Sequence, residues 1–477
     1  MPALRLRTDS EALATHFDAI RTRLEVPTEF APAALELATA RAAAGLAGSD
    51  TPRDYVERRD VEFLSIDPEG SRDLDQALRI ERNGSGFRFF YAIADVAAWV
   101  EPGDAIDSEA RRRGTTVYCP DMRIPLHPLD LSEGAASLLA DEDRPALLWE
   151  ISLDQRGEIS DIAVARSLVR NRRAMSYTAV QQQLDAGTTD ESLRLIEEVG
   201  RLRRDLETAR GGVSLILPEQ QVEHVDDHFE LRYEPTLAVE DHNAQLSLCC
   251  GIAAASLMIG AGFGLLRTLP PADAESLDQL RRHALALGVA WPDGMSYATW
   301  VRTLDATTPQ GAALMHQCAQ TLRGAGYAAF DGDLPAEHRH EAIAADYAHV
   351  TAPLRRLADR FANECVLAAA AHGRPPAWVI EALPLLAPIM AETGRRANAV
   401  DHASVDVMEA AVLSGRVGDV FEAVVTSTRH GVATVQLLDP AVIAAVHDAT
   451  LTAGTDVRVR LVNADFDGPT VTFATQR

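Results

Sequence analysis

The feature that most constrains this chain is an acidic stretch lying between two apolar runs. Asp67, Asp73 and Asp75 fall within nine residues of one another. The runs at 61–66 and 77–80 are typical of strands, and the proline and glycine between them indicate a loop. Asp73 and Asp75 are two apart, so in an extended chain their side chains share a face. Because clustered carboxylates repel one another and hard divalent cations bind oxygen, the stretch predicts a metal site.

The acidic loop also has a simpler interpretation. The chain carries 70 Asp and Glu residues against 45 basic ones, and a run of charge is usually a solvated face. A match in spacing is a hypothesis, so spacing alone leaves both interpretations open.

Two motifs resemble the catalytic domain of the ribonuclease II / ribonuclease R (RNB) family of exoribonucleases. The family pattern at the first motif is Ile-Asp, five variable residues and Asp-x-Asp-Asp. Asp67, Asp73 and Asp75 match this pattern, and Gln76 replaces the fourth acid. The second motif, at 347–359, reads Tyr-Ala-His-Val-Thr-Ala-Pro-Leu-Arg-Arg-Leu-Ala-Asp. It is similar to the family's Tyr-x-His-Phe-Thr-Ser-Pro-Ile-Arg-Arg-Tyr-x-Asp.

The resemblance, which covers roughly residues 60–477, implies roles for these side chains. Asp75 and Arg355 would be catalytic, and the three aspartates together with Gln76 would hold Mg²⁺, or Mn²⁺ in its place. Because the Gln76 amide carries no charge, we expect one metal site to be weakened, or to be completed by water and RNA phosphate. We also expect a helix to begin near Pro353, where backbone N–H groups and Arg355 would bind the scissile phosphate.

Four further residues are implied to contact RNA. Tyr118 stands where the family stacks an aromatic ring on a base near the RNA 3′ end, an interaction worth about 1–3 kcal/mol per base. Without the family, a tyrosine beside a proline is better read as core packing. Arg356 and His349 belong to the second motif, and Asp401 matches an acidic family position more loosely.

The chain is too long for one ordinary core, and it predicts an α+β multidomain protein. Residues 1–58 read as two helices, either a small module resembling a helix-turn-helix or a helical strap. Residues 59–413 would form the RNB catalytic domain, a mixed sheet with surrounding helices. Residues 414–477 read as short strands of an S1-type OB-fold barrel. The first segment is too short for two cold-shock-type domains, so we expect a short form that lacks them.

Composition argues partly against an RNA enzyme. The net charge is −25 and no lysine is present, whereas RNA phosphates require cations. Arginines gathered in a channel, together with bound metal, would resolve this conflict. The five cysteines form no C-x-x-C pair, and we find no signal sequence, which favours reduced thiols in the cytoplasm. The uncharged stretch at 246–266 predicts a buried helix rather than a membrane span.

The expected function is that of a Mg²⁺-dependent hydrolytic 3′→5′ exoribonuclease that degrades single-stranded RNA processively to nucleoside 5′-monophosphates. The alternative is a catalytically inactive RNA-binding protein that retains the RNB fold. Gln76 is the residue that raises the alternative. We expect single-stranded RNA as the partner, no membrane, and a monomer.

Overall fold

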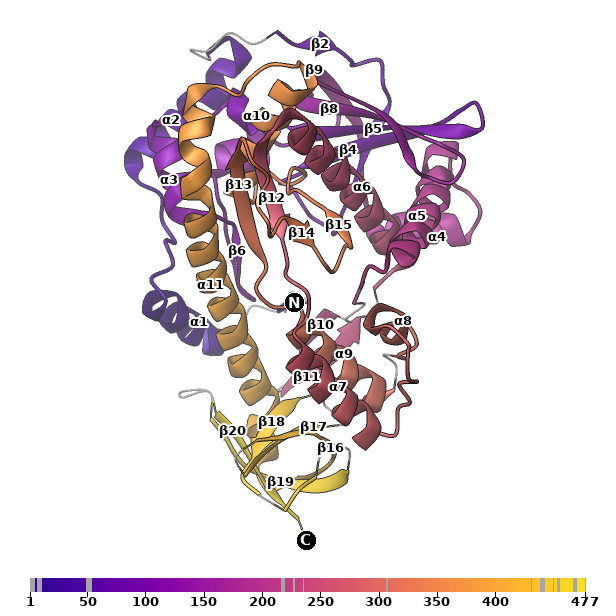
Figure 1. Cartoon of the computed structure of the whole chain (residues 1–477). Coiled ribbons are helices and arrows are strands. Elements are labelled where there is room, and N and C mark those ends of the chain that lie inside the picture. Colours follow the sequence, from indigo (N-terminus) through magenta and orange to yellow (C-terminus); the bar gives the residue numbers. More distant parts are fainter. Residues whose placement is uncertain are drawn as a thin grey trace.

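The computed structural model describes residues 5–6, 11–48, 54–215, 219–225, 228–234, 236–305, 308–429, 431–437, 442–448, 450–452, 455–465 and 470–476. The helices and strands form an amino-terminal helical segment, a central domain built on a sheet, and a carboxy-terminal barrel (Figure 1). This is the predicted α+β architecture.

A six-stranded mixed sheet with the order β2-β9-β3-β4-β5-β8 forms the centre. Its strands are β2 (Val56–Glu57), β3 (Phe63–Asp67), β4 (Gln76–Asn83), β5 (Gly86–Ala94), β8 (Asp143–Leu153) and β9 (Ile159–Ser176). Strand β3 runs parallel to β9, whereas β3–β4, β4–β5 and β5–β8 are antiparallel pairs. Because β9 pairs with β8 over its first residues and with β3 over its last ones, the sheet curls and closes through β9.

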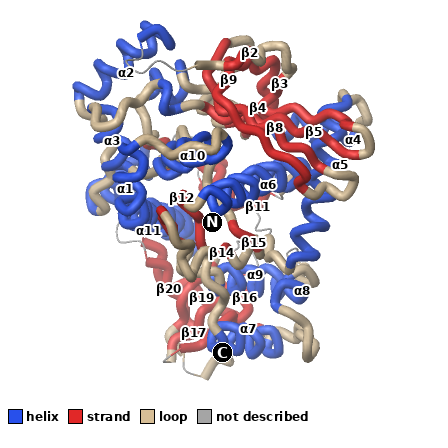
Figure 2. The backbone as a smooth tube through the Cα atoms, turned by 45° about the horizontal axis from the view of Figure 1, so that its top comes forward, coloured by secondary structure: helices blue, strands red, loops and turns tan. Residues whose placement is uncertain are grey.

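Side chains alternate along these strands, so the sheet separates two cores. Leu78 and Tyr91 point to the face covered by helices, while Ala77 and Ala92 point to the other face. Figure 2 shows helices lying beside the strands on the first of these faces. The helices of this core include α4 (Tyr177–Asp185), α5 (Glu191–Arg210), α6 (Ala238–Ala261), α10 (Leu357–Ala370) and the first part of α11 (Ala377–Leu413). Each large apolar side chain buried there contributes about 1.5–3 kcal/mol.

Helix α6 is the apolar stretch that raised the question of a membrane. Among the described residues it is the helix with the length and hydropathy to span one. Its Cys249, Cys250 and Met258 are completely buried within the sheet core, and core helices of soluble proteins meet the same criterion. The helix ends at Ala261, because Gly262 adopts a left-handed conformation (φ 79°) that stops it.

The region after α6 is only partly helical. It contains the helices α7 (Ala274–Ala286), α8 (Tyr297–Val301) and α9 (Pro309–Thr321). Beside them, β12 (Phe263–Thr268) pairs antiparallel with β13 (Gly326–Asp331). The shorter strands are β1 (Arg5–Leu6), β6 (Val117–Tyr118), β7 (Arg123–Ile124), β10 (Glu219–Val225), β11 (His228–Glu234), β14 (Arg339–His340) and β15 (Ala345–Asp346).

The amino-terminal segment packs as a strap on the rest of the chain. Helix α1 (Glu11–Arg23) buries Phe17 and Ile20 against the carboxy-terminal half of helix α11 (Ala377–Leu413). Helix α2 (Pro32–Ala44) buries Ala38 in the second sheet core and contacts α3 (Ala105–Arg113). The two predicted helices are confirmed, and each one contacts a different part of the central domain.

Helix α11 connects the central domain to the barrel (Figure 1). It contacts α1, β6 and the barrel strands β19 and β20, and Leu413 at its end is buried in the barrel core. The closed barrel has the order β16-β17-β18-β20-β19, which confirms the predicted OB-type fold. Its strands are β16 (Val420–Arg429), β17 (Val432–Leu437), β18 (Ile443–Val446), β19 (Asp456–Asp465) and β20 (Thr470–Thr475).

Candidate active site

The acidic loop connects β3 to β4 and is held firmly at its middle. Asp67 is the last residue of β3. The Ser137 hydroxyl donates to the Arg72 carbonyl oxygen at 2.6 Å and accepts from the Leu74 N–H at 2.9 Å. These two bonds fix the backbone on both sides of Asp73. The loop therefore presents its carboxylates from an ordered backbone.

Asp75 is buried, and both of its carboxylate oxygens have neighbours. Oδ1 accepts a hydrogen bond from the Leu354 N–H at 2.7 Å, and Oδ2 lies 3.5 Å from Nε of Arg355. Burial raises the pKa of Asp75 to about 8, against the opposing charge of Arg355. Burial likewise raises the pKa of Asp67 to about 7, again opposed by Arg355 and reinforced by Asp73. The buried Asp75 and the partly buried Asp67, near a single guanidinium, form a place where a further cation would be stabilised.

Asp73 takes part in a different ion pair. Its carboxylate pairs with Arg123, whose guanidinium also pairs with Glu133. Nε of Arg72 lies 3.6 Å from the second oxygen of Glu133. Asp73 is therefore already neutralised by an arginine, unlike Asp67.

Gln76 is directed toward the helix-covered face of the sheet. Its Oε1 accepts a hydrogen bond from the hydroxyl of the fully buried Tyr91 on β5. Burial raises the pKa of Tyr91 well above its ordinary value, so this hydroxyl stays protonated and can donate. The amide oxygen that was predicted to bind metal is thus occupied by a neighbouring side chain.

The predicted helix start at Pro353 is wrong, because α10 begins at Leu357. The preceding residues run as a loop, whose Ala352 N–H donates to Oδ2 of Asp359 at 2.8 Å. The Arg355 carbonyl accepts from the Thr116 N–H at 3.0 Å. The Arg356 N–H donates to the Ala352 carbonyl at 2.9 Å, so these residues form a single turn, and the regular helix follows it only from Leu357. The Leu354 N–H, expected to bind phosphate, is bound to Asp75 instead.

Tyr118 and Arg355 lie together at the exposed side of this site. The Tyr118 side chain is 47% exposed, and its hydroxyl accepts a hydrogen bond from the Arg355 guanidinium. Arg355 itself is 46% exposed. The pair is thus exposed to solvent, while its neighbour Asp75 is largely buried.

The other residues implied to contact RNA have internal partners. The Arg356 guanidinium donates to both oxygens of Asp359, at 3.0 and 2.8 Å. Nδ1 of His349 shares a 2.7 Å hydrogen bond with the Tyr327 hydroxyl, and burial lowers the pKa of His349 well below its ordinary value. Asp401 lies on α11, where burial raises its pKa. Their contacts with RNA stay predictions.

Sequence reasoning missed Arg123, Glu133 and Tyr91. Arg123 lies opposite Tyr118 in the two-stranded ribbon β6–β7. A Pro-Asp turn flanked by short apolar segments is a hairpin signal that would have placed these two residues side by side. The contact between Glu133 and Arg123 had no comparable signal.

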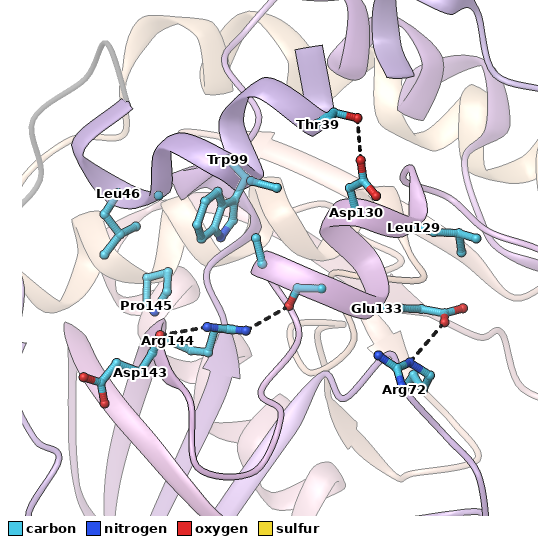
Figure 3. A pocket seen from close by; sticks show the side chains of 14 residues that line it. Thr39, Leu46, Arg72, Trp99, Leu129, Asp130, Glu133, Asp143, Arg144 and Pro145 are labelled. Atoms are coloured by element: carbon cyan, nitrogen blue, oxygen red, sulfur yellow. Dashed lines mark hydrogen bonds and ion pairs between the residues drawn. The ribbon is translucent and has the colours of Figure 1, made fainter. Parts of the chain in front are cut away.

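A pocket of about 700 Å³ borders the acidic loop. Figure 3 shows Arg72 and Glu133 on one side of it, and Thr39 of α2 bonded to Asp130 on another. The amino-terminal strap therefore forms part of a wall that reaches the loop carrying Asp73.

The donor atoms suit one divalent cation better than several. Carboxylate oxygens are the ligands that Mg²⁺ and Mn²⁺ prefer, and Asp67 and Asp75 have raised pKa values because burial disfavours their charge. The described part of the chain contains no group of three His, Cys, Asp or Glu side chains arranged to hold a metal. Asp67 and Asp75 are the residues that fit an ion, whereas Asp73 and Gln76 have other partners.

A curled mixed sheet with buried acids at a strand end, joined by a long helix to a closed barrel, defines a protein of the ribonuclease II type. A model of the RNB domain matches residues 55–371, well over half of the chain. A model of the RNase II-type exonuclease C-terminal S1 domain matches residues 419–476. The chain therefore belongs to the RNB family, as its motifs predicted.

Curated relatives agree with this placement. The exosome complex exonuclease RRP44 homolog A of Arabidopsis thaliana is 31% identical over 333 residues, which cover 65% of this chain and 35% of that protein. Ribonuclease R of Escherichia coli K12 is 28% identical over 400 residues, which cover 78% of this chain and 48% of that protein. The chain thus spans between a third and a half of the length of these relatives.

Solved structures share the fold. Mycoplasma genitalium RNase R, in complex with ribose-methylated single-stranded RNA, superposes with a TM-score of 0.85 at 18% identity, covering 96% of this chain and 77% of that one. Yeast Ssd1, described as a pseudonuclease, gives a TM-score of 0.70 at 15% identity, covering 94% and 55%. At these identities the likeness concerns the fold alone.

Proposed function

We propose that this chain is a hydrolytic 3′→5′ exoribonuclease that degrades single-stranded RNA to nucleoside 5′-monophosphates and depends on Mg²⁺, with Mn²⁺ as a substitute. The observation that carries the proposal is the placement of two acids near Arg355: Asp75 is buried and Asp67 is partly buried. Burying acids is unfavourable without a function or a counter-charge. A processive monomer working in the cytoplasm is part of the same proposal.

The chain's own residues supply most of the chemistry. Asp67 and Asp75 would hold the metal ion, which when bound activates water and stabilises charge on the leaving oxygen. Arg355 is half-exposed and lies 3.5 Å from Asp75, so it would neutralise the phosphate as negative charge develops. The Leu354 N–H keeps the Asp75 carboxylate oriented toward this arginine.

Tyr118 would position the end of the RNA strand. Its exposed ring offers a stacking surface to a terminal base, and stacking accepts any base. The hydrogen bond to Arg355 joins this surface to the site of phosphate binding. A base stacked on Tyr118 would therefore bring its phosphate close to Arg355. RNase R of M. genitalium has been seen with single-stranded RNA, which is consistent with this class of ligand.

The second candidate function is an inactive RNA-binding protein. Gln76 favours it, because an uncharged amide engaged by Tyr91 replaces an acid of the family pattern. Ssd1 illustrates that the fold occurs in a pseudonuclease. The three remaining aspartates and Arg355 favour the enzyme.

Product and substrate analysis tests the proposal. The full chain is incubated with matched RNA and DNA oligomers in Mg²⁺, and the products are separated by chromatography. We expect nucleoside 5′-monophosphates from RNA and at least tenfold slower degradation of DNA, because the 2′-hydroxyl is the available discriminator. Equal degradation of the two oligomers, or nucleoside 3′-monophosphates as products, would contradict the proposal. Binding of RNA without any product would support the inactive alternative.

A further inference from the structure

Arg123, which lies outside the acidic loop, forms an ion pair with an aspartate of that loop. One end of its guanidinium pairs with Oδ1 of Asp73 and the other with Oε1 of Glu133. The three side chains are only 26%, 14% and 22% exposed, respectively. An ion pair shielded to this extent is screened less than one on the surface.

The position of Arg123 is fixed by the ribbon that carries it. Its neighbour Ile124 and the facing Val117 are buried against α1 and α11. The turn of the ribbon is closed by a hydrogen bond from the Cys119 N–H to the Met122 carbonyl at 2.9 Å. An anchored backbone thus holds the Arg123 guanidinium beside Asp73. A group that acts through its charge has to be held in a fixed position in this way.

Charge balance at the site suits a single metal ion. Four carboxylates, those of Asp67, Asp73, Asp75 and Glu133, face the guanidinium groups of Arg123 and Arg355. Two negative charges remain, which one divalent cation neutralises. Arg72 also approaches Glu133, but its side chain is 66% exposed, so water screens its charge. A second divalent cation would leave an excess of positive charge before RNA binds.

A second ion would also lack ligands. It would have to compete with Arg123 for Asp73, and like charges at such short range repel. Gln76, beside Asp75 in the chain, offers an amide oxygen that already accepts from Tyr91. The two groups that could complete a second site are therefore both engaged.

We infer that Arg123 permanently supplies, at Asp73, the positive charge that a second metal ion would otherwise bring, so that the site holds one divalent cation on Asp67 and Asp75. This inference rests on the proposed function, because it concerns the metal that the function requires. It makes Arg123 a positioning and charge-balancing residue, with Glu133 as its anchor. It also explains how the chain tolerates Gln76, because the charge lost with the fourth acid belongs to a site that Arg123 replaces.

Counting bound Mn²⁺ tests the inference without measuring activity. The full-length chain without RNA is titrated with Mn²⁺, and free ion is followed by electron paramagnetic resonance. We expect one Mn²⁺ per chain. Arg123→Met removes the guanidinium and keeps the length of the side chain, so we expect it to bind a second Mn²⁺ at least tenfold more tightly than any second ion in the parent. Arg123→Lys restores the charge and should again bind one.

Arg72→Met is the matched control. It removes an arginine whose guanidinium approaches Glu133, whereas the ion pair described for Asp73 is with Arg123. We expect this variant to bind one ion like the parent. Two ions in the parent, or one ion in a folded Arg123→Met protein, would overturn the inference and leave the proposed function intact. No ion in any of the proteins would overturn the metal dependence of the proposed function and the inference with it. Because the parent count is itself decisive, an Arg123→Met protein that does not fold leaves the test valid.

Discussion

At the scale of single residues, the site depends on the contrast between buried acids and an accessible arginine. Asp75 is 4% exposed, whereas the Arg355 side chain beside it is 46% exposed. The acid is thus shielded from water, and the arginine can reach a substrate. This separation lets a single cluster bind a cation on one side and a phosphate on the other.

Replacing Asp75 by asparagine tests its role. Asp75→Asn keeps the shape and the acceptor for the Leu354 N–H but removes the charge that would hold the cation. We expect turnover to fall by roughly 10²-fold or more, measured as the initial rate of nucleotide release. Asp60→Asn, at a side chain that is 78% exposed, is the control and should behave like the parent. An Asp75→Asn protein as active as the parent would show that Asp75 has no catalytic role.

The pH dependence of stability reports on the same two acids. In the metal-free protein the pKa values of Asp67 and Asp75 are raised to about 7 and about 8, from an ordinary value of 3.8. Between these limits the folded state keeps protons that the unfolded chain has released, so stability falls as pH rises. Metal binding needs the deprotonated acids, so it becomes tighter over the same rise.

We therefore expect Mg²⁺ to raise the Tm of the parent more at about pH 8.5 than at about pH 6. The measurement is thermal unfolding at both pH values, with and without Mg²⁺. Asp75→Asn should reduce the difference, because one of the two titrating acids is gone. A Mg²⁺ effect on Tm that is equal at both pH values would contradict the assignment of these acids as metal ligands.

The residues in the two motifs were predictable because each motif is continuous in sequence. Asp75 and Arg355 meet as the family pattern implies. Arg123 was not predictable from spacing, because the hairpin brings it to Asp73 from a distant part of the chain. The engagement of Gln76 by Tyr91 depends on the register of β4 with β5, which the sequence pattern does not specify.

At the scale of elements, the β6–β7 ribbon is the part of the site that the amino-terminal strap controls. The ribbon carries both Tyr118 and Arg123. Arg21 of α1 donates to both oxygens of Asp121 in its turn, at 2.7 and 3.0 Å. Phe17 of α1 is buried in the same cluster as Val117 of β6. The strap thus has a structural link to the residues that would meet the RNA end.

Removing that link should weaken RNA positioning. Arg21 is only 5% exposed, and its loss leaves Asp121 without its partner. We expect Arg21→Ala to cost about 1–3 kcal/mol of stability and to raise KM for short RNA several-fold, with a smaller change in kcat. Arg23→Ala on the same helix, at an exposed position, should change neither. Thermal unfolding and steady-state kinetics measure both effects. An Arg21→Ala protein with an unchanged KM would contradict the proposal that α1 influences RNA positioning.

Periodicity predicted most elements but not their starting points near the site. Helices α1, α2 and α6 follow the sequence patterns that indicated them. The start of α10 was misplaced, because Pro353 is a good first residue of a helix. The N–H groups on either side of it donate instead to the carboxylates of Asp359 and Asp75, which hold the segment before Leu357 in a separate turn. The local tendency of Pro353 to begin a helix was therefore overridden by tertiary contacts.

At the scale of the whole molecule, acidity and RNA binding have to coexist. The chain has a net charge of −25, so its surface as a whole does not attract RNA. The positive charges that would attract RNA are at the site itself. They are those of Arg355 and of the metal ion that Asp67 and Asp75 would hold. The barrel was predictable from the sequence as a separate unit, whereas the closure of the sheet through β9 was not, because a single long strand pairs with two partners.

The most direct test of exonuclease activity uses a single-stranded RNA labelled at its 5′ end. The full chain is incubated with this RNA in Mg²⁺, and a parallel reaction contains EDTA. We expect a descending ladder that ends at a short labelled oligomer in Mg²⁺, and intact RNA in EDTA, because the acids of the site need a cation to act. Tight binding of the RNA with no cleavage in Mg²⁺ or Mn²⁺ would contradict the enzyme and indicate an RNA-binding protein in which Gln76 marks the lost activity.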